Sequence, residues 1–491
     1  MPDNVLLSVD QMYKADTLAG QGGVPSLDLM EAAGQAIAIE ILNRWKKRPV
    51  TVLAGPGNNG GDGFVVARLL DKAGWPVHLA LLGEVATLEG DAAVNAGRWQ
   101  QETVKLTPEI LDNDPLVVDA LFGAGLSRPL EGEARTIVQT INERNLDCIA
   151  VDIPSGVHGD SGEVLGGAGA ALNATVTVTF FRAKTGHFLL PGWQLCGQLV
   201  IADIGIPDGV LDDIGPKTFF NGPNLWLDNF PWPEAAGHKY SRGHAVVCGG
   251  AELTGAARLA AMGARRLGAG LVTIAAPPDA VDIYAKEEPG TMVKAVKDVA
   301  GFRDLLGDPR MTAILAGPGL GVSDATRECV LSALSTGKAT VIDADGLSAF
   351  SDDPDALFEA INGPCLMTPH DGEFQRLFST AGDKLARTRR AAGTTGSVVL
   401  LKGADTVIAD ASGNAVINAT GTPDLATAGS GDVLAGMALG LMTQGMNPYQ
   451  AACASAWIHG TVAEKIGPGL IAEDLPANLP LTLRDLKDFR S

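Results

Sequence analysis

The chain has 491 residues, of which 46% are hydrophobic, 19% charged and 5% aromatic, and it contains 61 glycines. That length favours two or three domains, and the apolar content excludes disorder for most of the chain. The net charge of −20 disfavours nucleic acids and anionic membrane surfaces as partners. Because the sequence has neither a signal-peptide pattern nor an apolar run of about 18 residues, we expect a soluble, cytoplasmic protein with no membrane and no nucleic-acid partner.

Short aliphatic runs alternate with helical patterns through the first part of the chain. Strands are predicted at residues 50–54, 77–82, 116–120, 148–152, 175–180 and 199–201, and helices at 29–45, 63–73 and 133–144. Continuous aliphatic strands separated by helices are typical of a parallel sheet that is covered on both faces. We therefore predict an α/β fold with a doubly wound, Rossmann-like sheet over residues 1–210.

The composition changes between the two halves of the chain. Several prolines with little periodicity lie between Asp203 and His238, which predicts a proline-rich linker at residues 211–237. A second α/β pattern occupies residues 238–491. Its strands are predicted at residues 244–248, 271–275, 313–316, 339–342, 364–367 and 398–401, and its helices at 254–267, 431–443 and 448–466.

A glycine-rich segment follows the first predicted strand. The sequence GPGNNGGDG places five glycines within residues 55–63, directly before a predicted helix. Glycine lets the backbone approach a ligand, and the N–H groups at a helix start can hold an anion. The spacing differs from the dinucleotide fingerprint, and a tight turn with a capping residue is the structural alternative.

Two further predicted strands end in oxygen-bearing side chains. Asp119 precedes a glycine loop at residues 123–125, and Asp152 and Ser155 lie at the end of the strand at 148–152. Ligands of open α/β sheets bind beyond the carboxyl ends of the strands, so these loops should converge. Asn59, Asp119 and Ser155 are hard oxygen donors suited to a group 1 or 2 cation, and the alternative is that each aspartate caps its own loop.

In that order, the sequences GPGNNGGDG, VDALFGAGLSRPLEG and VDIPSG closely resemble the NAD(P)H-hydrate epimerase domain over residues 1–210. The resemblance implies a K⁺ ion held by Asn59, Asp119 and Ser155. It places Asp152 beside the damaged nicotinamide ring, which makes this carboxylate our candidate acid–base catalyst. It also implies contacts between the hydrated dinucleotide and Asn58, Asn59, Gly60, Gly61, Asp62, Gly123, Ala124, Gly125, Leu126, Ser127, Arg128, Pro129 and Asp152.

A second glycine-rich motif opens the helix predicted at residues 431–443. In TAGSGDVLAG, the N–H groups of Gly429–Gly431 can hold charge on a transferred phosphoryl group, and Asp432 can accept a proton from an attacking hydroxyl. A capping aspartate is the structural alternative. Lys402, in a predicted turn, would bring a cation to a nucleotide phosphate unless the turn is only a solvated hairpin. His370, at a strand exit, favours ligand contact over a structural role.

Together with GPGLG, DADGL, TPHDGEF and LKGADT, this motif resembles the ADP/ATP-dependent NAD(P)H-hydrate dehydratases, a branch of the ribokinase-like superfamily, over residues 235–470. The resemblance implies a ribokinase-like α/β domain, Mg²⁺, ADP as phosphoryl donor and Asp432 as catalytic base. It implies contacts to the hydrate at Ala256, Gly319, His370 and Asp432. It implies contacts to the nucleotide at Lys402, Gly403, Ala404, Asp405, Thr406, Gly429, Ser430 and Gly431.

The two resemblances together predict an enzyme that repairs hydrated NADH and NADPH. The first domain would interconvert the R and S epimers of NADHX and NADPHX, and the second would dehydrate the S epimer while ADP yields AMP and phosphate. The resemblance also implies a homo-oligomer. The alternative is a small-molecule kinase, acting on a vitamin or a sugar, fused to a non-catalytic binding domain. The sequence leaves open the choice between NADHX and NADPHX.

Overall fold

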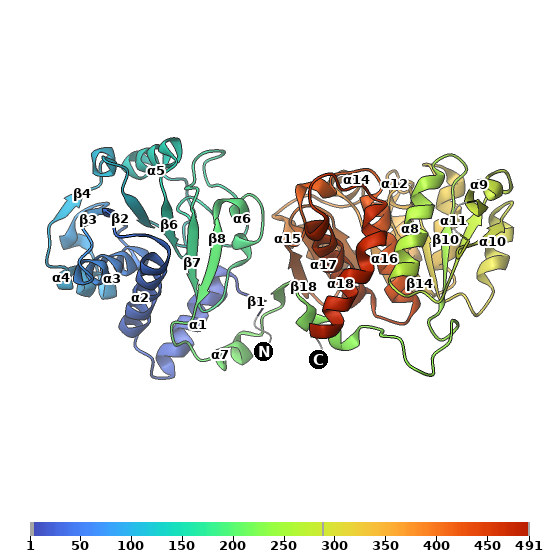
Figure 1. The fold of residues 1–491 in the computed structure, drawn as a ribbon, viewed down its shortest axis with the longest axis horizontal. Helices are drawn as coiled ribbons and strands as arrows, with labels where there is room; N and C mark the ends of the chain where they lie inside the picture. The colour runs from blue at the N-terminus through green and yellow to red at the C-terminus, as the bar shows by residue number, and fades with distance from the viewer. Residues whose placement is uncertain (1–3, 287–288, 490–491) are drawn as a thin grey trace. The chain divides into compact units, whose positions relative to one another are not determined.

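A computed structural model describes residues 4–286 and 289–489 of the chain. The chain divides into two compact units, the first ending at residue 218 and the second beginning at residue 219 (Figure 1). Within the described residues, no helix has both the length and the apolar character that a membrane crossing requires.

The first unit is built on a parallel sheet. All neighbouring strand pairs described in it run parallel. The strands lie in the order β4 (Thr103–Lys105), β3 (Val77–Leu81), β2 (Val50–Ala54), β5 (Leu116–Ala120), β6 (Cys148–Val151), β7 (Val176–Phe180) and β8 (Gln198–Ala202). The chain moves outward from β2 in one direction and from β5 in the other, so the sheet reverses its strand order between these two strands. Ligands of open α/β sheets bind at such a reversal, beyond the carboxyl ends of the strands.

Seven helices of this unit are described. They are α1 (Val9–Gln21), α2 (Ser26–Arg44), α3 (Asn58–Lys72), α4 (Gly90–Arg98), α5 (Gly132–Arg144), α6 (Gly192–Leu195) and α7 (Val210–Ile214). The predicted strands are confirmed to within one residue at each end, but α3 begins five residues earlier than predicted. Glycines of the GPGNNGGDG segment serve close packing in its first turn, since a Cβ on Gly60 would lie 1.9 Å from the carbonyl oxygen of Gly55.

Helix α1 was not predicted from the sequence. Its hydrophobic pattern is weak, because only Met12, Ala15 and Ala19 are buried. The local signal is instead a capping box, in which the Ser8 hydroxyl accepts from the Gln11 N–H and the Gln11 side chain accepts from the Ser8 N–H. The capping box stabilises the start of α1, although this helix has no broad apolar face.

The second unit also contains a mainly parallel sheet. Its strands lie in the order β9 (Thr218–Phe220), β18 (Ala415–Asn418), β17 (Thr406–Ala409), β16 (Val398–Leu401), β15 (Cys365–Met367), β14 (Ala339–Ile342), β13 (Ala313–Ala316), β10 (His244–Cys248), β11 (Leu271–Ala276) and β12 (Met292–Ala295). Strands β10 to β16 pair in parallel, whereas β16–β17 and β17–β18 are antiparallel hairpins. The reversal of strand order now falls between β10 and β13.

The helices of this unit match the predictions where a prediction was made. They are α8 (Thr254–Arg266), α9 (Val281–Ala285), α10 (Val299–Leu306), α11 (Asp324–Leu334), α12 (Asp345–Ser348), α13 (Pro354–Ala360), α14 (Asp371–Leu377), α15 (Lys384–Thr395), α16 (Ser430–Thr443), α17 (Pro448–Ile466) and α18 (Asp474–Phe489). Figure 1 shows α8, α16, α17 and α18 layered together in front of this sheet. The layer and the strands share one apolar core.

Helices α8 and α16 approach each other closely because small residues line their contact. A Cβ on Gly436 would lie 2.0 Å from the carbonyl oxygen of Ala260, and one on Gly440 would lie 2.5 Å from that of Ala264. No side chain other than hydrogen fits at either glycine. This packing fixes α16, and with it the aspartate at its start, against the centre of the sheet.

The segment predicted as a proline-rich linker differs from that expectation. Part of it belongs to the second unit, where Trp226, Leu227 and Phe230 are buried in the core at 1%, 6% and 8% exposure. The Asn221 N–H donates to the Ile417 carbonyl and ties the segment to β18. Its prolines are compatible with this packing because they occupy short 3-10 turns and extended stretches. The aromatic residues of this segment predict its burial better than its prolines predict a linker.

Candidate active sites

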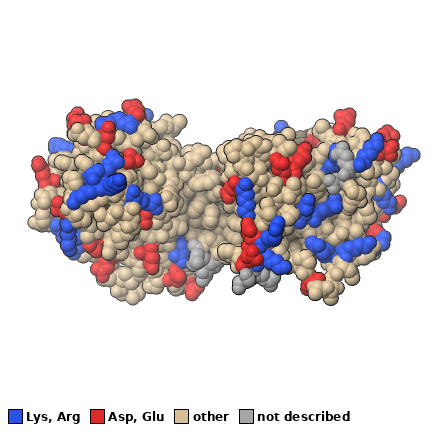
Figure 2. Space-filling model, in the orientation of Figure 1, with Lys and Arg blue, Asp and Glu red and all other residues tan. Residues whose placement is uncertain are grey.

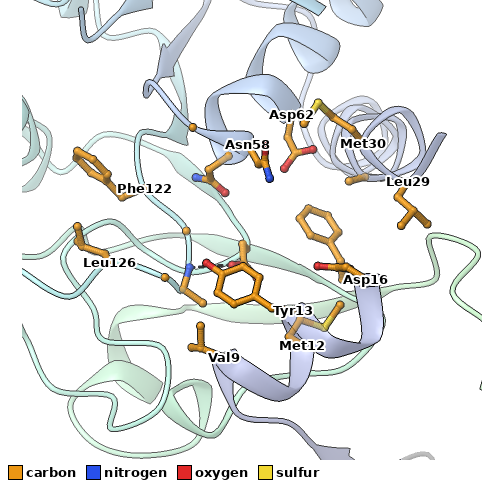
Figure 3. Close-up of a pocket in the computed structure, with 18 of the residues that line it drawn as sticks. Val9, Met12, Tyr13, Asp16, Leu29, Met30, Asn58, Asp62, Phe122 and Leu126 are labelled. Carbon is orange, nitrogen blue, oxygen red and sulfur yellow. Dashed lines mark hydrogen bonds between the residues drawn. The ribbon is translucent and has the colours of Figure 1, made fainter. Parts of the chain in front are cut away.

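A cavity of about 560 Å³ lies at the reversal of the first sheet. The loops after β2 and β5 form one side of it, and helices α1 and α2 form the other. Figure 3 shows Tyr13 and Asp16 reaching into it from α1, and Asn58 and Asp62 from the start of α3. On the face of this unit that Figure 2 shows, acidic and basic side chains are interspersed, and the cavity is the candidate ligand site.

The structure brings most of the predicted dinucleotide contacts to this cavity. Asn58, Asn59, Asp62 and residues 123–128 line it. Gly60 and Gly61 instead pack against Gly55 and Met30, and Pro129 is not among the lining residues described. Gly60 and Gly61 therefore allow the loop to pack closely on the side away from the cavity.

Asp119 and Ser155 form one buried hydrogen-bonded unit. The Ser155 hydroxyl donates to Asp119 Oδ1 at 2.7 Å, and its backbone N–H donates to Oδ2 at 2.8 Å. The Ser155 hydroxyl oxygen accepts from the Phe122 N–H at 3.0 Å. Asn59 lies against the same loop, where a Cβ on Gly123 would be 3.1 Å from its Oδ1, and its buried Nδ2 has no hydrogen-bond partner among the described residues. The three predicted cation ligands, Asn59, Asp119 and Ser155, thus surround the loop that follows β5.

Asp152 is held as a carboxylate by its neighbours. The Lys184 ammonium donates to its Oδ1 at 2.6 Å, the Thr179 hydroxyl to the same oxygen at 3.0 Å, and the Ala124 N–H to Oδ2 at 2.9 Å. Burial opposes ionisation, but the charge of Lys184 and these hydrogen bonds outweigh it and lower the pKa of Asp152 to about 2. Its backbone is in the left-handed region at φ 67°, which costs free energy and is typical of functional positions. Such a carboxylate is poorly suited to exchange a proton near neutral pH.

Three residues of this cavity were missed by the sequence analysis. Lys184 follows β7, Tyr13 and Asp16 lie on α1, and all three line the cavity. The Tyr13 hydroxyl sits over the glycine loop, where a Cβ on Gly125 would lie 2.2 Å from it. Lys184 had a signal, since it follows the carboxyl end of a predicted strand; the α1 residues had only the capping box.

In the second unit, two glycine segments meet at the reversal of the sheet. Gly250 follows β10 and Gly319 follows β13, and a Cβ on Gly250 would lie 1.8 Å from the carbonyl oxygen of Gly319. A Cβ on Gly319, whose φ is +70°, would lie 3.2 Å from that of Ala256. Two of the predicted hydrate contacts, Gly319 and Ala256, are therefore neighbours at the expected sheet edge.

Asp432 lies in the first turn of α16, after Gly429 in the left-handed conformation at φ 90°. Burial, together with the charges of Asp343, Asp345 and Glu373, raises the pKa of Asp432 to about 6 against the opposing charge of Lys402. A carboxylate with that pKa can accept a proton near neutral pH. Its position in α16 also directs free backbone N–H groups toward the same region.

Lys402 lies beside the start of α16. Its ammonium is 3.5 Å from the place where a Cβ on Gly431 would stand, and it donates to Asp343 Oδ1 at 2.7 Å. Asp343 and the other facing carboxylates raise the pKa of Lys402 against the effect of burial, so the lysine stays cationic. Ala344, next to Asp343, has φ 51°, a second strained position at a candidate site. Asp343 and Asp345 belong to the sequence DADGL, for which the sequence alone predicted no individual role.

Other predicted contacts of this unit have roles within the fold. His370 caps α14, because its Nδ1 accepts the N–H groups of Gly372 and Glu373 at 2.9 and 3.3 Å. Asp405 is paired with Lys384 at 2.6 Å, and the Thr406 hydroxyl donates to the Gly403 carbonyl within the β16–β17 turn. The Ser430 hydroxyl donates to the Leu425 carbonyl at 2.8 Å. His370 keeps an exposed imidazole edge, with 56% of the side chain accessible, so capping and ligand contact are compatible.

The fold and these sites define the class of protein. It joins a Rossmann-like α/β unit, with a cavity at its sheet reversal, to a second α/β unit with a glycine–aspartate helix start suited to phosphoryl transfer. A family model described as NAD(P)H-hydrate dehydratase matches residues 244–479, and one described as YjeF-related protein N-terminus matches residues 26–186.

Curated relatives match nearly the whole chain. A bifunctional NAD(P)H-hydrate repair enzyme Nnr of Moorella thermoacetica is 36% identical over 98% of this chain and 97% of its own length. One of Coxiella burnetii is 34% identical over 96% of this chain and 98% of its own length. A solved ADP/ATP-dependent NAD(P)H-hydrate dehydratase of Bacillus subtilis is 27% identical, covering 52% of this chain and 94% of that chain at a TM-score of 0.45. The chain belongs to the family of bifunctional NAD(P)H-hydrate repair enzymes.

Proposed function

We propose that this chain repairs hydrated NADH and NADPH, epimerising the hydrates in its first unit and dehydrating the S epimer at the expense of ADP in its second. The observation that carries the proposal is the arrangement around Asp432. A carboxylate with a pKa of about 6, a helix start with free N–H groups and the cation of Lys402 meet at one sheet edge. A proton acceptor, backbone N–H donors and a cation are groups that phosphoryl-transfer sites use.

In the proposed dehydration, Asp432 takes the proton of the C6 hydroxyl while the hydroxyl oxygen attacks the terminal phosphorus of ADP. The bond from that phosphorus to the bridging oxygen breaks, and AMP leaves with the electron pair. Backbone N–H groups of residues 429–431 and the Lys402 ammonium are placed to hold the transferred negative charge. The C6–O bond then breaks, phosphate leaves, and loss of a C5 proton restores the dihydronicotinamide ring. Phosphate leaves far more readily than hydroxide, which explains the use of a nucleotide.

The donor set around Ser155 fits a monovalent cation. Asp119 and Ser155 present a carboxylate and a hydroxyl, and the orphaned amide nitrogen of Asn59 marks a buried polar position with no partner in the described residues. Rotation of the amide exchanges its nitrogen and oxygen, which would give a third oxygen ligand. We therefore propose that Asn59, Asp119 and Ser155 hold K⁺, which would supply positive charge near the anionic dinucleotide.

The second unit fits a magnesium ion only in company with a nucleotide. Among the described residues, no group of three His, Cys, Asp or Glu side chains is close enough to form a metal cage. Mg²⁺ commonly binds through one or two carboxylates and substrate phosphates, and Asp343 and Asp345 face this region. When bound there, Mg²⁺ would neutralise phosphate charge during transfer. Family membership further supports small-molecule substrates, action in the cytoplasm and a homo-oligomer.

The decisive experiment supplies the purified full chain with a mixture of R and S hydrates and ADP. Absorbance of the reduced nicotinamide should appear for both epimers, with one AMP and one phosphate released per coenzyme repaired. The chain should repair only the S epimer if the first unit is a non-catalytic binding domain. Consumption of ADP with a vitamin alcohol or a sugar, and none with the hydrates, would instead favour the small-molecule kinase and refute the proposal.

A further inference from the structure

Two carboxyl groups face the first cavity without partners. Figure 3 shows Asp62 directed into it from α3 and Asp16 directed into it from α1. Asp62 is 8% exposed, and neither side chain is hydrogen-bonded to another residue in the described part of the chain. Because these carboxyl oxygens line the cavity and bind no other described side chain, they are available to a ligand that enters it.

The groups around Asp16 and Asp62 give these carboxyls a higher pKa than that of Asp152. Burial raises the pKa of Asp16 to about 6, with Asp152 adding to the effect and Lys184 opposing it. Burial also raises the pKa of Asp62 well above its ordinary value, and Asp152 and Asp16 add to this. The other titratable groups facing the cavity are Tyr13 on α1, Asp91 on α4, Arg128 after β5, Asp152 after β6 and Lys184 after β7. Lys184 is committed to Asp152 at 2.6 Å, so it fixes that charge and leaves Asp16 and Asp62 free to exchange protons.

We propose that Asp16 and Asp62 form a two-sided acid–base pair for inversion at C6, with Asp16 the catalytic residue that no motif identifies. This inference rests on the proposed epimerase function of the first unit. Inversion at C6 by loss and re-addition of the hydroxyl uses a proton donor on the face that the hydroxyl leaves and a proton acceptor on the face that water attacks. Asp62 and Asp16 enter the cavity from two different helices, which suits the two faces of a bound ring.

The proposed step balances without any further reactant. Asp62 gives its proton to the C6 hydroxyl, the C6–O bond breaks, and water leaves while the N1 electron pair forms a C6–N1 double bond. A water molecule then adds to C6 from the other face as Asp16 takes its proton, and the electron pair returns to N1. The proton passes back from Asp16 to Asp62 through solvent. Asp152, held as an anion, favours the transient positive charge on the ring.

This assignment places one of the two catalytic residues on a helix outside the part of the chain that the N-terminal family model matches. The match to the N-terminal family model begins at residue 26, whereas α1 spans Val9–Gln21. Five residues of α1 line the cavity, namely Val9, Met12, Tyr13, Asp16 and Gly20. The capping box at Ser8 fixes the start of this helix and so the position of Asp16 two turns further on.

The test follows the conversion of the R epimer of hydrated NADH to the S epimer by the full chain, without ADP and across the range from about pH 5 to about pH 9. Asp16→Asn should lower kcat by about 10²-fold or more with little change in KM. In the wild type the rate should fall below about pH 6 as Asp16 takes up a proton, and this limb should be absent in Asp16→Asn. In water labelled with heavy oxygen, each inversion should place one labelled oxygen on C6.

Controls separate a catalytic role from a structural one. Asp10→Asn removes a carboxylate from an exposed position of the same helix and should leave kcat and the pH profile unchanged. Asp16→Glu should recover part of the rate and keep a low-pH limb. Wild-type kcat and an unchanged limb in Asp16→Asn, or inversion without oxygen exchange, would overturn the inference while leaving the epimerase function in place. A wild-type chain that does not interconvert the epimers would instead refute the proposed function itself.

Discussion

Replacing Lys184 by methionine removes the cation that holds Asp152 as a buried anion. The two side chains are 3% and 16% exposed and 2.6 Å apart, so solvent screens the pair little. The pKa of Asp152 falls from its ordinary 3.8 to about 2, which corresponds to about 2 kcal/mol in favour of the folded first unit. Methionine keeps the length of the side chain but leaves the carboxylate unpaired. Removal of one partner of such a pair typically costs about 3–5 kcal/mol, and we expect about 3 kcal/mol here.

The pH dependence has a definite sign. The folded pKa of Asp152 is depressed, so its stabilising contribution is present above about pH 4 and is lost as the pH falls toward about 2. The difference in stability between the wild type and Lys184→Met should therefore narrow in acid. Hydrogen exchange of the amides of β6 and β7, measured during urea titration of the full chain, reports the first unit by itself.

A double variant supplies the matched control. Lys184→Met combined with Asp152→Asn removes both charges, retains a polar acceptor for the Thr179 hydroxyl, and should recover most of the lost stability. A cost below about 1 kcal/mol for Lys184→Met, or a double variant less stable than the single one, would show that Asp152 is not held ionised by this lysine.

Three further predictions concern the second unit. Asp432→Asn should leave epimerisation intact and slow ADP-dependent repair by about 10²-fold or more. Repair by the wild type should decline below about pH 6 as Asp432 is protonated. The nicotinamide absorbance measures the repair rate in each case. Gly429→Ala should lower stability by about 1–2 kcal/mol, because φ is 90° and the new Cβ would lie 2.5 Å from Leu259, whereas Gly393→Ala, with open space around it, should not destabilise in the same urea titration. Trp226→Ala should cost about 3–5 kcal/mol in that assay, since the indole is 1% exposed; a cost under about 1 kcal/mol would restore the linker interpretation.

Strands and the loops after them were predictable because each rule behind them is local. A buried parallel strand is a short aliphatic run, and the strands at residues 116–120, 244–248 and 398–401 have the predicted bounds. The carboxyl-end rule then brings Asp119 and Ser155 to one sheet edge without any knowledge of strand order, and Asp432 was found from the glycine-rich start of its helix. Only the structure shows which loops are neighbours, since the reversal of strand order depends on contacts between distant segments.

The missed features have physical reasons that differ from one another. Helix α1 has few buried positions, so periodicity could not find it, and Asp16 went unnoticed with it. The segment around Trp226 was judged by its prolines, although a buried aromatic residue contributes far more to a core than a proline removes. Asp152 is our candidate acid–base catalyst from the resemblance to the epimerase domain, and that assignment stays a prediction. Its partner Lys184 is 32 residues away in the sequence, so the ion pair could not be predicted from local patterns.

The carboxylates of the two units show how one residue type takes different roles. Asp152 is half-buried beside a committed lysine and stays anionic. Asp62 is buried, and Asp16 and Asp432 are half-buried, among other carboxylates, so these three hold protons more tightly. Lys402 is close to Asp432 but donates to Asp343, so it lowers the pKa of Asp432 too little to prevent proton uptake near neutral pH. In an acidic chain that acts on an anionic coenzyme, the position of each lysine therefore decides which carboxylate fixes charge and which one moves protons. Moving a lysine from one carboxylate to another should therefore exchange their roles. The single and double variants of Lys184 and Asp152 test the part of this claim that concerns Asp152.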